Sequence, residues 1–193
     1  MIEVFNQIYE QRSWGDGSGP GSHADGLGPY KLFLAGIINR YNIKSVVDCG
    51  CGHFGPYSDM DWGDVDYTGV DVSAQCYSLN QPFSNPHRRF FQGDFLTMPY
   101  LSADLVLCKD VLQHWSEDHI LQGLVKFREF PLALITNSVI NGPEPVNGQI
   151  ETGGYRPLNL FQKPFGLVPF EWDCYKVSTN EQDIKIMLLI KNL

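Results

Sequence analysis

Apolar positions along the chain follow two periods, one typical of helices and one typical of strands. Apolar residues at helical spacing predict a short first helix over 2–9 and a second helix that begins at Pro29, a residue well suited to the first helical turn. Two more helices are expected over 73–79 and 116–130, the latter with Ser116 as its N-cap. The second helix carries a continuous apolar stripe: Tyr30, Phe33, Leu34, Ile37, Ile38 and Tyr41.

Short apolar segments between these helices predict buried strands at 44–48, 67–72, 89–91, 103–108 and 132–136. Near the end, the segments 171–178 and 183–190 flank a polar turn at 179–182, a pattern typical of a β-hairpin. Strands that alternate with helices form parallel sheets, and the hairpin adds antiparallel strands at an edge. The expected fold is therefore α/β: a mostly parallel seven-stranded sheet with helices on both faces and a C-terminal antiparallel β-hairpin.

The length of 193 residues suits one domain with a core of its own. We expect residues 30–193 to form this core and residues 1–29 to add the first helix and a glycine-rich stretch, residues 13–22. Glycines let the backbone bend, and Trp14 offers a large surface, so this stretch could close over a ligand as a lid. The same composition also fits a flexible tail.

A formal net charge of -8 argues against a nucleic acid or an anionic membrane as partner. We find no signal-peptide pattern and no apolar run near the roughly 18 residues of a membrane span. The expected location is the cytoplasm, with the five cysteines reduced. Cys49 and Cys51 lack a second cysteine or histidine pair at zinc spacing, so no metal is expected.

A glycine-rich turn follows the first predicted strand: Gly50, Gly52 and Gly55 form a G-x-G-x-x-G pattern. Glycines there let the backbone approach a ligand at the carboxyl end of the strand. The next strand ends about 20 residues later in Asp71, where a carboxylate can bind ribose hydroxyls. Up to this point the pattern fits a dinucleotide and S-adenosylmethionine equally well.

Three features favour the sulfonium cofactor. Asp48 stands directly before the glycines, where it would repel a pyrophosphate. The residues after the turn, from Pro56 to Trp62, make a poor helix, although a pyrophosphate site needs a helix N-terminus. The third and fourth strands are also followed by acids, Asp94 and Asp110, on the same rim of the sheet.

These segments resemble the motifs of class I S-adenosylmethionine-dependent methyltransferases, which have a Rossmann-like fold. Residues 46–52 resemble motif I, 67–71 the ribose-binding strand end, 93–95 the adenine-side motif and 104–115 the fourth-strand segment. The chain departs from the family in that Phe54 intervenes before the third glycine. The resemblance implies that Asp71 binds ribose, Asp94 the adenine amino group and the glycine turn the methionine end. The expected cofactor-binding residues are Trp14, Asp48, Gly50, Cys51, Gly52, Asp71, Val72, Asp94, Phe95 and Lys109.

Methyl transfer to a neutral hydroxyl or amine requires removal of a proton. His114 is the candidate base, with Asp110 one helical turn earlier if that segment is helical; alternatively His114 only packs against or caps the following helix. Tyr155 and Arg156 follow two glycines and are candidates for binding an anionic or sugar-like acceptor. A surface loop with a structural arginine explains them equally well.

We therefore expect a methyltransferase that acts on a small-molecule or sugar-like acceptor. The D/N-P-P-Y motif of nucleic-acid amino-methyltransferases is absent after the fourth predicted strand. Two alternatives stay open: an NAD(P)-binding oxidoreductase and a non-catalytic protein with the methyltransferase fold. The sequence leaves the acceptor and the oligomeric state undefined.

Overall fold

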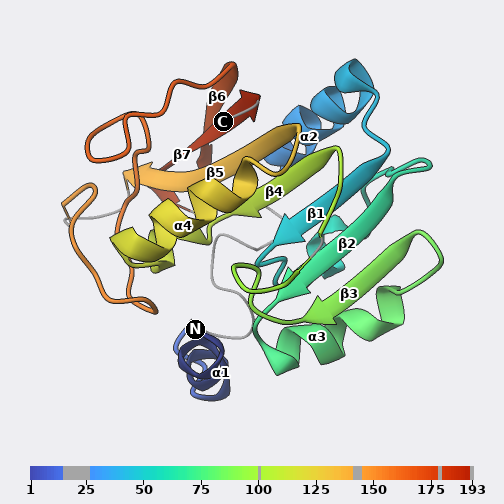
Figure 1. Ribbon diagram of the computed structural model, residues 1–193, viewed down its shortest axis with the longest axis horizontal. Coiled ribbons are helices and arrows are strands. Elements are labelled where there is room, and N and C mark those ends of the chain that lie inside the picture. The colour runs from blue at the N-terminus through green and yellow to red at the C-terminus, as the bar shows by residue number, and fades with distance from the viewer. Residues whose placement is uncertain (15–26, 100, 141–144, 178–179, 192–193) are drawn as a thin grey trace.

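The computed structural model describes residues 1–14, 27–99, 101–140, 145–177 and 180–191. Seven strands form one sheet in the order β3-β2-β1-β4-β5-β7-β6 (Figure 1). Strands β1 to β5 pair in parallel, and β7 is antiparallel to both β5 and β6. This topology confirms the expected fold. The strands are β1 Ser45–Cys49, β2 Asp66–Asp71, β3 Arg88–Gln92, β4 Leu105–Lys109, β5 Leu132–Ile140, β6 Glu171–Val177 and β7 Asn180–Lys191.

The helices begin where the sequence provides caps. The side chain of Ser73 accepts a hydrogen bond from the backbone N–H of Cys76, and that of Ser116 accepts one from His119. Pro29 lies in the first turn of its helix. The α-helices are α1 Ile2–Glu10, α2 Gly28–Tyr41, α3 Ala74–Asn80 and α4 Glu117–Phe127, and the short 3₁₀ helices are η3 Gly55–Tyr57, η4 Gln81–Phe83 and η5 Leu112–His114.

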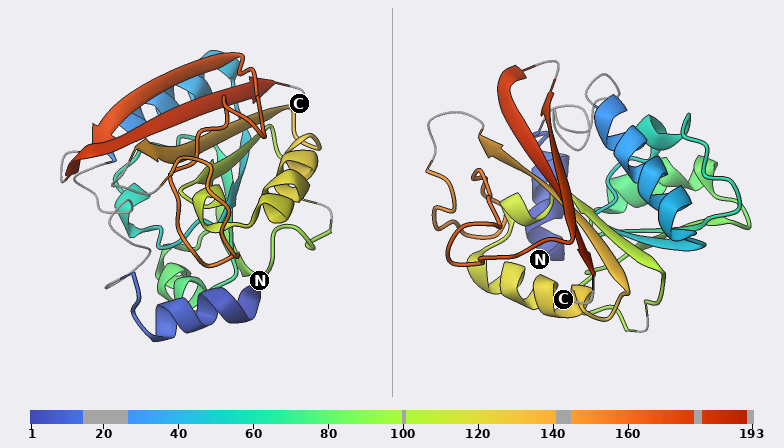
Figure 2. Two further views of the ribbon diagram at one scale, coloured as in Figure 1. Left: turned by 90° about the vertical axis from the view of Figure 1, so that its left-hand side faces the viewer. Right: turned by 90° about the horizontal axis from the view of Figure 1, so that it is seen from above.

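Helices cover both faces of the sheet (Figure 2). On one face, α2 buries Tyr30, Leu34 and Ile37 against the sheet. On the other, α4 buries an apolar side that includes Ile120 and Leu124. Because both faces are covered, the central strands β1 and β4 are almost entirely buried, as the continuous apolar runs in the sequence indicate.

Helix α1 lies beyond the carboxyl ends of the parallel strands rather than against a face of the sheet (Figure 1). At one side, the side chain of Asn6 accepts a hydrogen bond from the backbone N–H of Ala74 at the start of α3, at 3.1 Å. At the other, Val4 and Ile8 pack so closely on Gly153 that a Cβ added there would lie 2.5 Å from Val4. Helix α1 thus bridges the carboxyl edge of the sheet.

Three predicted boundaries were wrong. Helix α4 ends at Phe127, three residues before its predicted end, and β5 continues to Ile140. Strand β7 begins at Asn180, inside the predicted turn, because the pairing of Val177 with Asn180 places the connection at residues 178–179, which lie outside the described residues. Long antiparallel pairing with β7 supports the extra length of β5. Across the described part of the chain, no helix combines the length and hydrophobicity needed to cross a membrane.

Candidate active site

The turn after β1 is held in a conformation that requires glycine. Gly50 has φ +69°, and a Cβ there would lie 2.4 Å from Cγ2 of Val111. The backbone N–H groups of Gly50 and Cys51 donate to the carbonyl of Val70, at 2.8 and 3.1 Å. As expected, no long helix follows this turn; the single 3₁₀ turn η3 does. The backbone therefore stays open toward the carboxyl edge of the sheet.

A cavity lies at this edge, with about 870 Å³ of empty space when its open mouth is included. All ten predicted cofactor-binding residues line it, as do both predicted catalytic residues, Asp110 and His114. The residues predicted to bind the acceptor, Tyr155 and Arg156, are not part of its lining. Helix α1 and the turn after it contribute further walls that the sequence did not predict, namely Met1, Phe5 and Tyr9.

Two buried carboxyl groups flank the glycine turn. Asp71 accepts hydrogen bonds from the backbone N–H groups of Gly52 and Ser73, both at 2.8 Å. Burial raises the pKa of Asp71, and these hydrogen bonds oppose the shift. Burial also raises the pKa of Asp48 to about 7, although the hydroxyl of Tyr67 donates to this carboxyl at 2.7 Å. A cation bound beside Asp48 would favour its ionised form.

The adenine-side segment lies at the tip of β3. Asp94 accepts a hydrogen bond from the backbone N–H of Leu96 at 3.0 Å, which fixes the carboxyl group in a short turn. Phe95 is buried and packs on Phe127 and Phe130. The cavity wall here combines one acid with an apolar surface, as an adenine ring and its amino group require.

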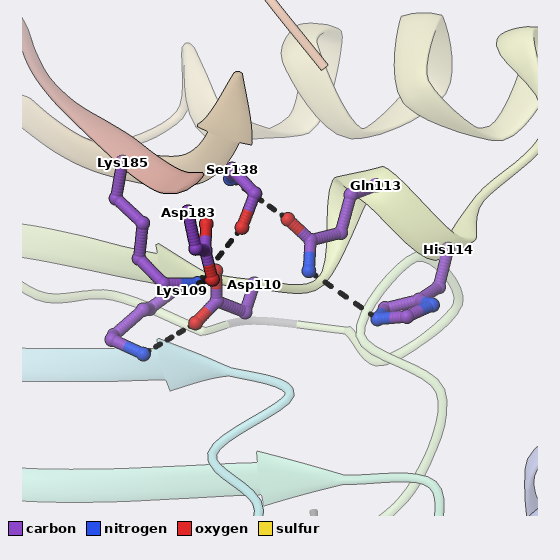
Figure 3. A network of polar contacts seen from close by, with 7 residues as sticks. All are labelled: Lys109, Asp110, Gln113, His114, Ser138, Asp183 and Lys185. Atoms are coloured by element: carbon purple, nitrogen blue, oxygen red, sulfur yellow. Dashed lines mark hydrogen bonds and ion pairs between the residues drawn. The ribbon is translucent and has the colours of Figure 1, made fainter. Parts of the chain in front are cut away.

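Beyond the tip of β4, Asp110 joins two buried lysines (Figure 3). Its carboxylate forms ion pairs with Lys109 and with Lys185 of β7, whose ammonium lies 2.6 Å away. Burial alone would raise the pKa of Asp110, but the two lysines outweigh it and lower the pKa to about 2. Burial lowers the pKa of Lys109, and Asp110 opposes that shift. Lys185 also donates to the hydroxyl of Ser138 at 3.0 Å.

The predicted pairing of Asp110 with His114 along a helix was wrong. Asp110 has φ +59°, so the backbone turns sharply there, and the following 3₁₀ helix begins only at Leu112. The carboxylate is occupied by lysines, whereas Nδ1 of His114 contacts the carbonyl oxygen of Gly154 at 2.8 Å. Asp110 therefore contributes to the cavity wall but does not orient the imidazole directly.

His114 is partly buried between two aromatic rings. Trp14 lies on it with ring centroids 4.6 Å apart, and Tyr155 flanks it at 5.7 Å. Because a carbonyl only accepts hydrogen bonds, the contact with Gly154 places the proton of the neutral ring on Nδ1. Burial lowers the pKa of His114, which keeps the ring neutral at pH 7. The lone pair is then on Nε2, and the side-chain amide nitrogen of Gln113 lies 3.5 Å from that atom.

Arg156 is 3% exposed, and its guanidinium donates to the backbone carbonyls of Gln113 and Trp115, at 3.3 and 2.8 Å. These contacts support the segment that carries His114, as expected for the alternative of a structural arginine. Most of the predicted glycine-rich lid, residues 15–22, lies outside the described residues; Trp14 is described and packs on Phe5, Tyr9 and His114.

Other functional contacts were not predicted from the sequence. Asn80, at the end of α3 and 1% exposed, accepts from the backbone N–H of Phe54 at 2.8 Å and donates to the carbonyl of Gly52 at 2.7 Å. It therefore fixes the glycine turn from the side. No signal in the sequence indicated this role, because the burial of Asn80 is visible only in the structure. Among the residues that the structure describes, no three histidine, cysteine or acidic side chains gather as metal ligands.

Comparisons with known proteins agree with this geometry. Residues 47–125 match the family model described as a methyltransferase domain. This segment contains the glycine turn, Asp71, Asp94 and His114. No curated protein sequence matches the chain.

Solved structures of three methyltransferases share the fold. The 1,6-didemethyltoxoflavin-N1-methyltransferase of Burkholderia thailandensis is 16% identical, with a TM-score of 0.68 over 98% of this chain and 86% of that chain. Magnesium protoporphyrin IX methyltransferase from Synechocystis PCC 6803 is 13% identical, with a TM-score of 0.60 over 98% and 96%. Human N-acetylserotonin methyltransferase is 16% identical, with a TM-score of 0.61 over 98% of this chain and 59% of that chain.

At these identities the structural likeness establishes the fold, and the family match covers the strands that build the cavity. Residues 47–125 thus match a methyltransferase domain, and the chain has the Rossmann-like fold of these solved methyltransferases.

Proposed function

We propose that the protein binds S-adenosylmethionine in the cavity at the carboxyl edge and transfers its methyl group to a hydroxyl or amine of a small-molecule acceptor. The observation that carries this proposal is the convergence in one cavity of the glycine turn, Asp71, Asp94 and His114. The similar solved structures include complexes with S-adenosylmethionine or S-adenosylhomocysteine, and one of them also holds the small molecule 1,6-didemethyltoxoflavin.

The residues present fit this cofactor. A Cβ at Gly50 would clash with the side chain of Val111, so only glycine lets the turn pack there with its backbone in the cavity wall. Asp71 accepts from the backbone N–H groups of Gly52 and Ser73 on different oxygens, and because a carboxylate has about four acceptor sites, ribose hydroxyls can still donate to it. Asp48 supplies a carboxyl group beside the expected position of the methionine amino group. When bound, the sulfonium supplies an activated methyl group with its leaving group already attached.

The chain's own residues supply alignment, exclusion of water and removal of a proton. Helix α1 and Trp14 supply part of the cavity wall and so limit the access of water to it. The bare Nε2 of His114 takes the acceptor proton as the nucleophilic oxygen or nitrogen attacks. Tyr155 flanks the imidazole and limits its rotation. The acidic net charge and the absence of the D/N-P-P-Y motif favour a small-molecule acceptor over nucleic acid.

Replacing Asp71 by alanine should weaken binding of S-adenosylhomocysteine by about 10–150-fold, since a hydrogen bond to a charged group contributes about 1.5–3 kcal/mol. Isothermal titration calorimetry measures this change directly. Asp66→Ala, at the exposed start of the same strand, is the matched control and should bind as the parent does. Unchanged affinity in Asp71→Ala would refute the ribose assignment.

The pKa of Asp48 makes cofactor affinity depend on pH. Because the free carboxyl has a pKa of about 7 and a bound cation lowers it, binding releases a proton below pH 7. We expect affinity for S-adenosylmethionine to be about tenfold lower at pH 6 than at pH 8. The Asp48→Asn variant should lose this dependence. If affinity changes with pH equally in the parent and in Asp48→Asn, the group that titrates is not Asp48.

A further inference from the structure

The cavity extends beyond the part assigned to the cofactor. The strand ends assigned to adenine, ribose and methionine belong to β3, β2 and β1, which are neighbours in the sheet, and β4 follows β1 in that order. Past the tip of β4, the cavity is lined by Val111, His114 and Trp115, with Tyr9 and Trp14 contributed by α1 and the turn after it. We call these five residues the acceptor end, because a cofactor that occupies β3 to β1 leaves this part of the cavity for the acceptor.

Aromatic rings make up most of the acceptor end. The rings of Trp14 and His114 lie with their centroids 4.6 Å apart, and Tyr9 meets Trp14 edge-on at 5.7 Å. Such rings bind a flat aromatic ligand through offset-stacked or edge-to-face contacts, which contribute beyond the apolar area that they bury. The acceptor end therefore has the surface that an aromatic compound requires.

Trp115 is a preformed part of this surface. Its six-membered ring lies so close to Gly123 of α4 that a Cβ added there would be 2.8 Å from Cζ3 of Trp115. The backbone carbonyl of Trp115 accepts a hydrogen bond from the guanidinium of Arg156 at 2.8 Å. Both the ring and the backbone are thus held in place before a ligand arrives. A wall that is already ordered loses little conformational freedom on binding, which favours affinity.

The charged side chains near the acceptor end are occupied by other contacts. Lys109 and Asp110, at the tip of β4, form an ion pair, and Asp110 also pairs with Lys185. Arg156 does not line the cavity, and its guanidinium donates to backbone carbonyls. Among the described residues, an anionic or sugar-like acceptor would have to compete with these contacts for its polar partners. An aromatic ring needs no such partner.

We propose that the acceptor end binds a planar aromatic ring, and that the methyl acceptor is an aromatic compound that carries its hydroxyl or amine on this ring. The inference rests on the proposed function, which gives the acceptor end its role, while the aromatic walls themselves are present whatever the cofactor is. The chemistry also fits, because a phenolic hydroxyl, with a pKa of about 10, gives up its proton far more readily than an aliphatic one.

Two probes with the same carbon skeleton and hydroxyl group test the preference: 2-naphthol, which is aromatic and flat, and decahydro-2-naphthol, which is saturated. In NMR titrations of protein saturated with S-adenosylhomocysteine, 2-naphthol should bind about 2–12-fold more tightly, the margin expected of an aromatic pair. Methyl glucoside should bind more weakly than either. If decahydro-2-naphthol or methyl glucoside binds as tightly as 2-naphthol, the proposal is overturned.

The four tryptophans of the chain report where the probe binds. Addition of 2-naphthol should shift the indole N–H signals of Trp14 and Trp115, which line the cavity. It should spare those of Trp62, in the core on the α2 face, and of the exposed Trp172 on β6. Binding that leaves the signals of Trp14 and Trp115 unmoved would contradict the proposal.

Substitution of Trp14 separates the aromatic contact from a general loss of packing. Trp14→Phe keeps a ring and should keep the preference for 2-naphthol, whereas Trp14→Leu should lower the ratio of the two dissociation constants at least about twofold. Trp172→Leu is the matched control and should leave the ratio unchanged. An unchanged ratio in folded Trp14→Leu would refute the contact.

The order of the titrations separates this inference from the proposed function. Binding of S-adenosylhomocysteine is measured first, and its absence would count against the proposed function. The titration of the cofactor-free protein with both probes would then still test the aromatic preference. If S-adenosylhomocysteine binds and displaces 2-naphthol, the probe had occupied the adenosyl part of the cavity, and the acceptor end is not an aromatic site.

Discussion

Replacing His114 by glutamine is expected to slow methyl transfer by about 10²–10⁴-fold, the contribution of a positioned general base. Glutamine preserves much of the volume beneath Trp14 but cannot take up a proton. Affinity for S-adenosylhomocysteine should stay within about twofold, because binding and proton removal are separate functions. The acceptor is first identified by screening hydroxyl, amine and sugar compounds for release of S-adenosylhomocysteine.

His87→Gln is the matched control, since His87 is exposed at the opposite end of the sheet and pairs with Asp66. It should retain full turnover. The lowered pKa of His114 also sets the pH dependence: the neutral base is present at pH 7, and the rate should fall only below the ordinary histidine pKa of 6.5. If His114→Gln turns over as fast as the parent, the base is another group or the acceptor needs none.

Replacing Lys185 by methionine is expected to lower the free energy of unfolding by about 3–5 kcal/mol. The Lys185 side chain is 2% exposed, and its ammonium lies 2.6 Å from Asp110 and 3.8 Å from Asp183. Without the Lys185 ammonium, the buried carboxylates of Asp110 and Asp183 lose a positive charge that compensates their own. The melting temperature should fall by roughly 6–20 °C for a chain of this size.

Urea denaturation monitored by circular dichroism measures the change. Lys176→Met, an exposed lysine on the neighbouring strand β6, should cost less than about 1 kcal/mol and serves as the control. Adding Asp110→Asn to Lys185→Met should restore part of the loss, because it removes one stranded charge. If Lys185→Met lowers the free energy of unfolding by less than about 1 kcal/mol, the expectation is wrong, and water must solvate the carboxylates once the ammonium is gone.

The acidic residues at the carboxyl edge of the sheet were predictable, because each one follows from the position of a single strand in the sequence. Each of the first four strands has a polar or acidic residue at or next to its end, and parallel strands bring their carboxyl ends to one edge. Asp48, Asp71, Asp94 and Lys109 therefore line a single cavity, as the sequence predicts. To predict that these residues lie together, it was enough to predict a parallel sheet, which the alternation of strands and helices indicates.

Contacts between distant segments could not be predicted in the same way. Lys185 reaches Asp110 across 75 residues, and Arg156 reaches the carbonyl of Trp115 across 41. Periodicity assigns a residue to a face but does not select its partner on another strand or loop. The helical spacing of Asp110 and His114 failed for a related reason: aspartate adopts positive φ more often than most residues but still rarely, so its surroundings decide the conformation at Asp110.

Calorimetric titration of the intact protein with S-adenosylhomocysteine and, separately, with NAD⁺ tests the central claim most directly. We predict saturable binding of S-adenosylhomocysteine at one site per chain and no measurable binding of NAD⁺. Binding of NAD⁺ in its place would indicate the oxidoreductase alternative. Binding of neither compound would contradict an adenosyl site at the carboxyl edge and favour a non-catalytic protein with the methyltransferase fold.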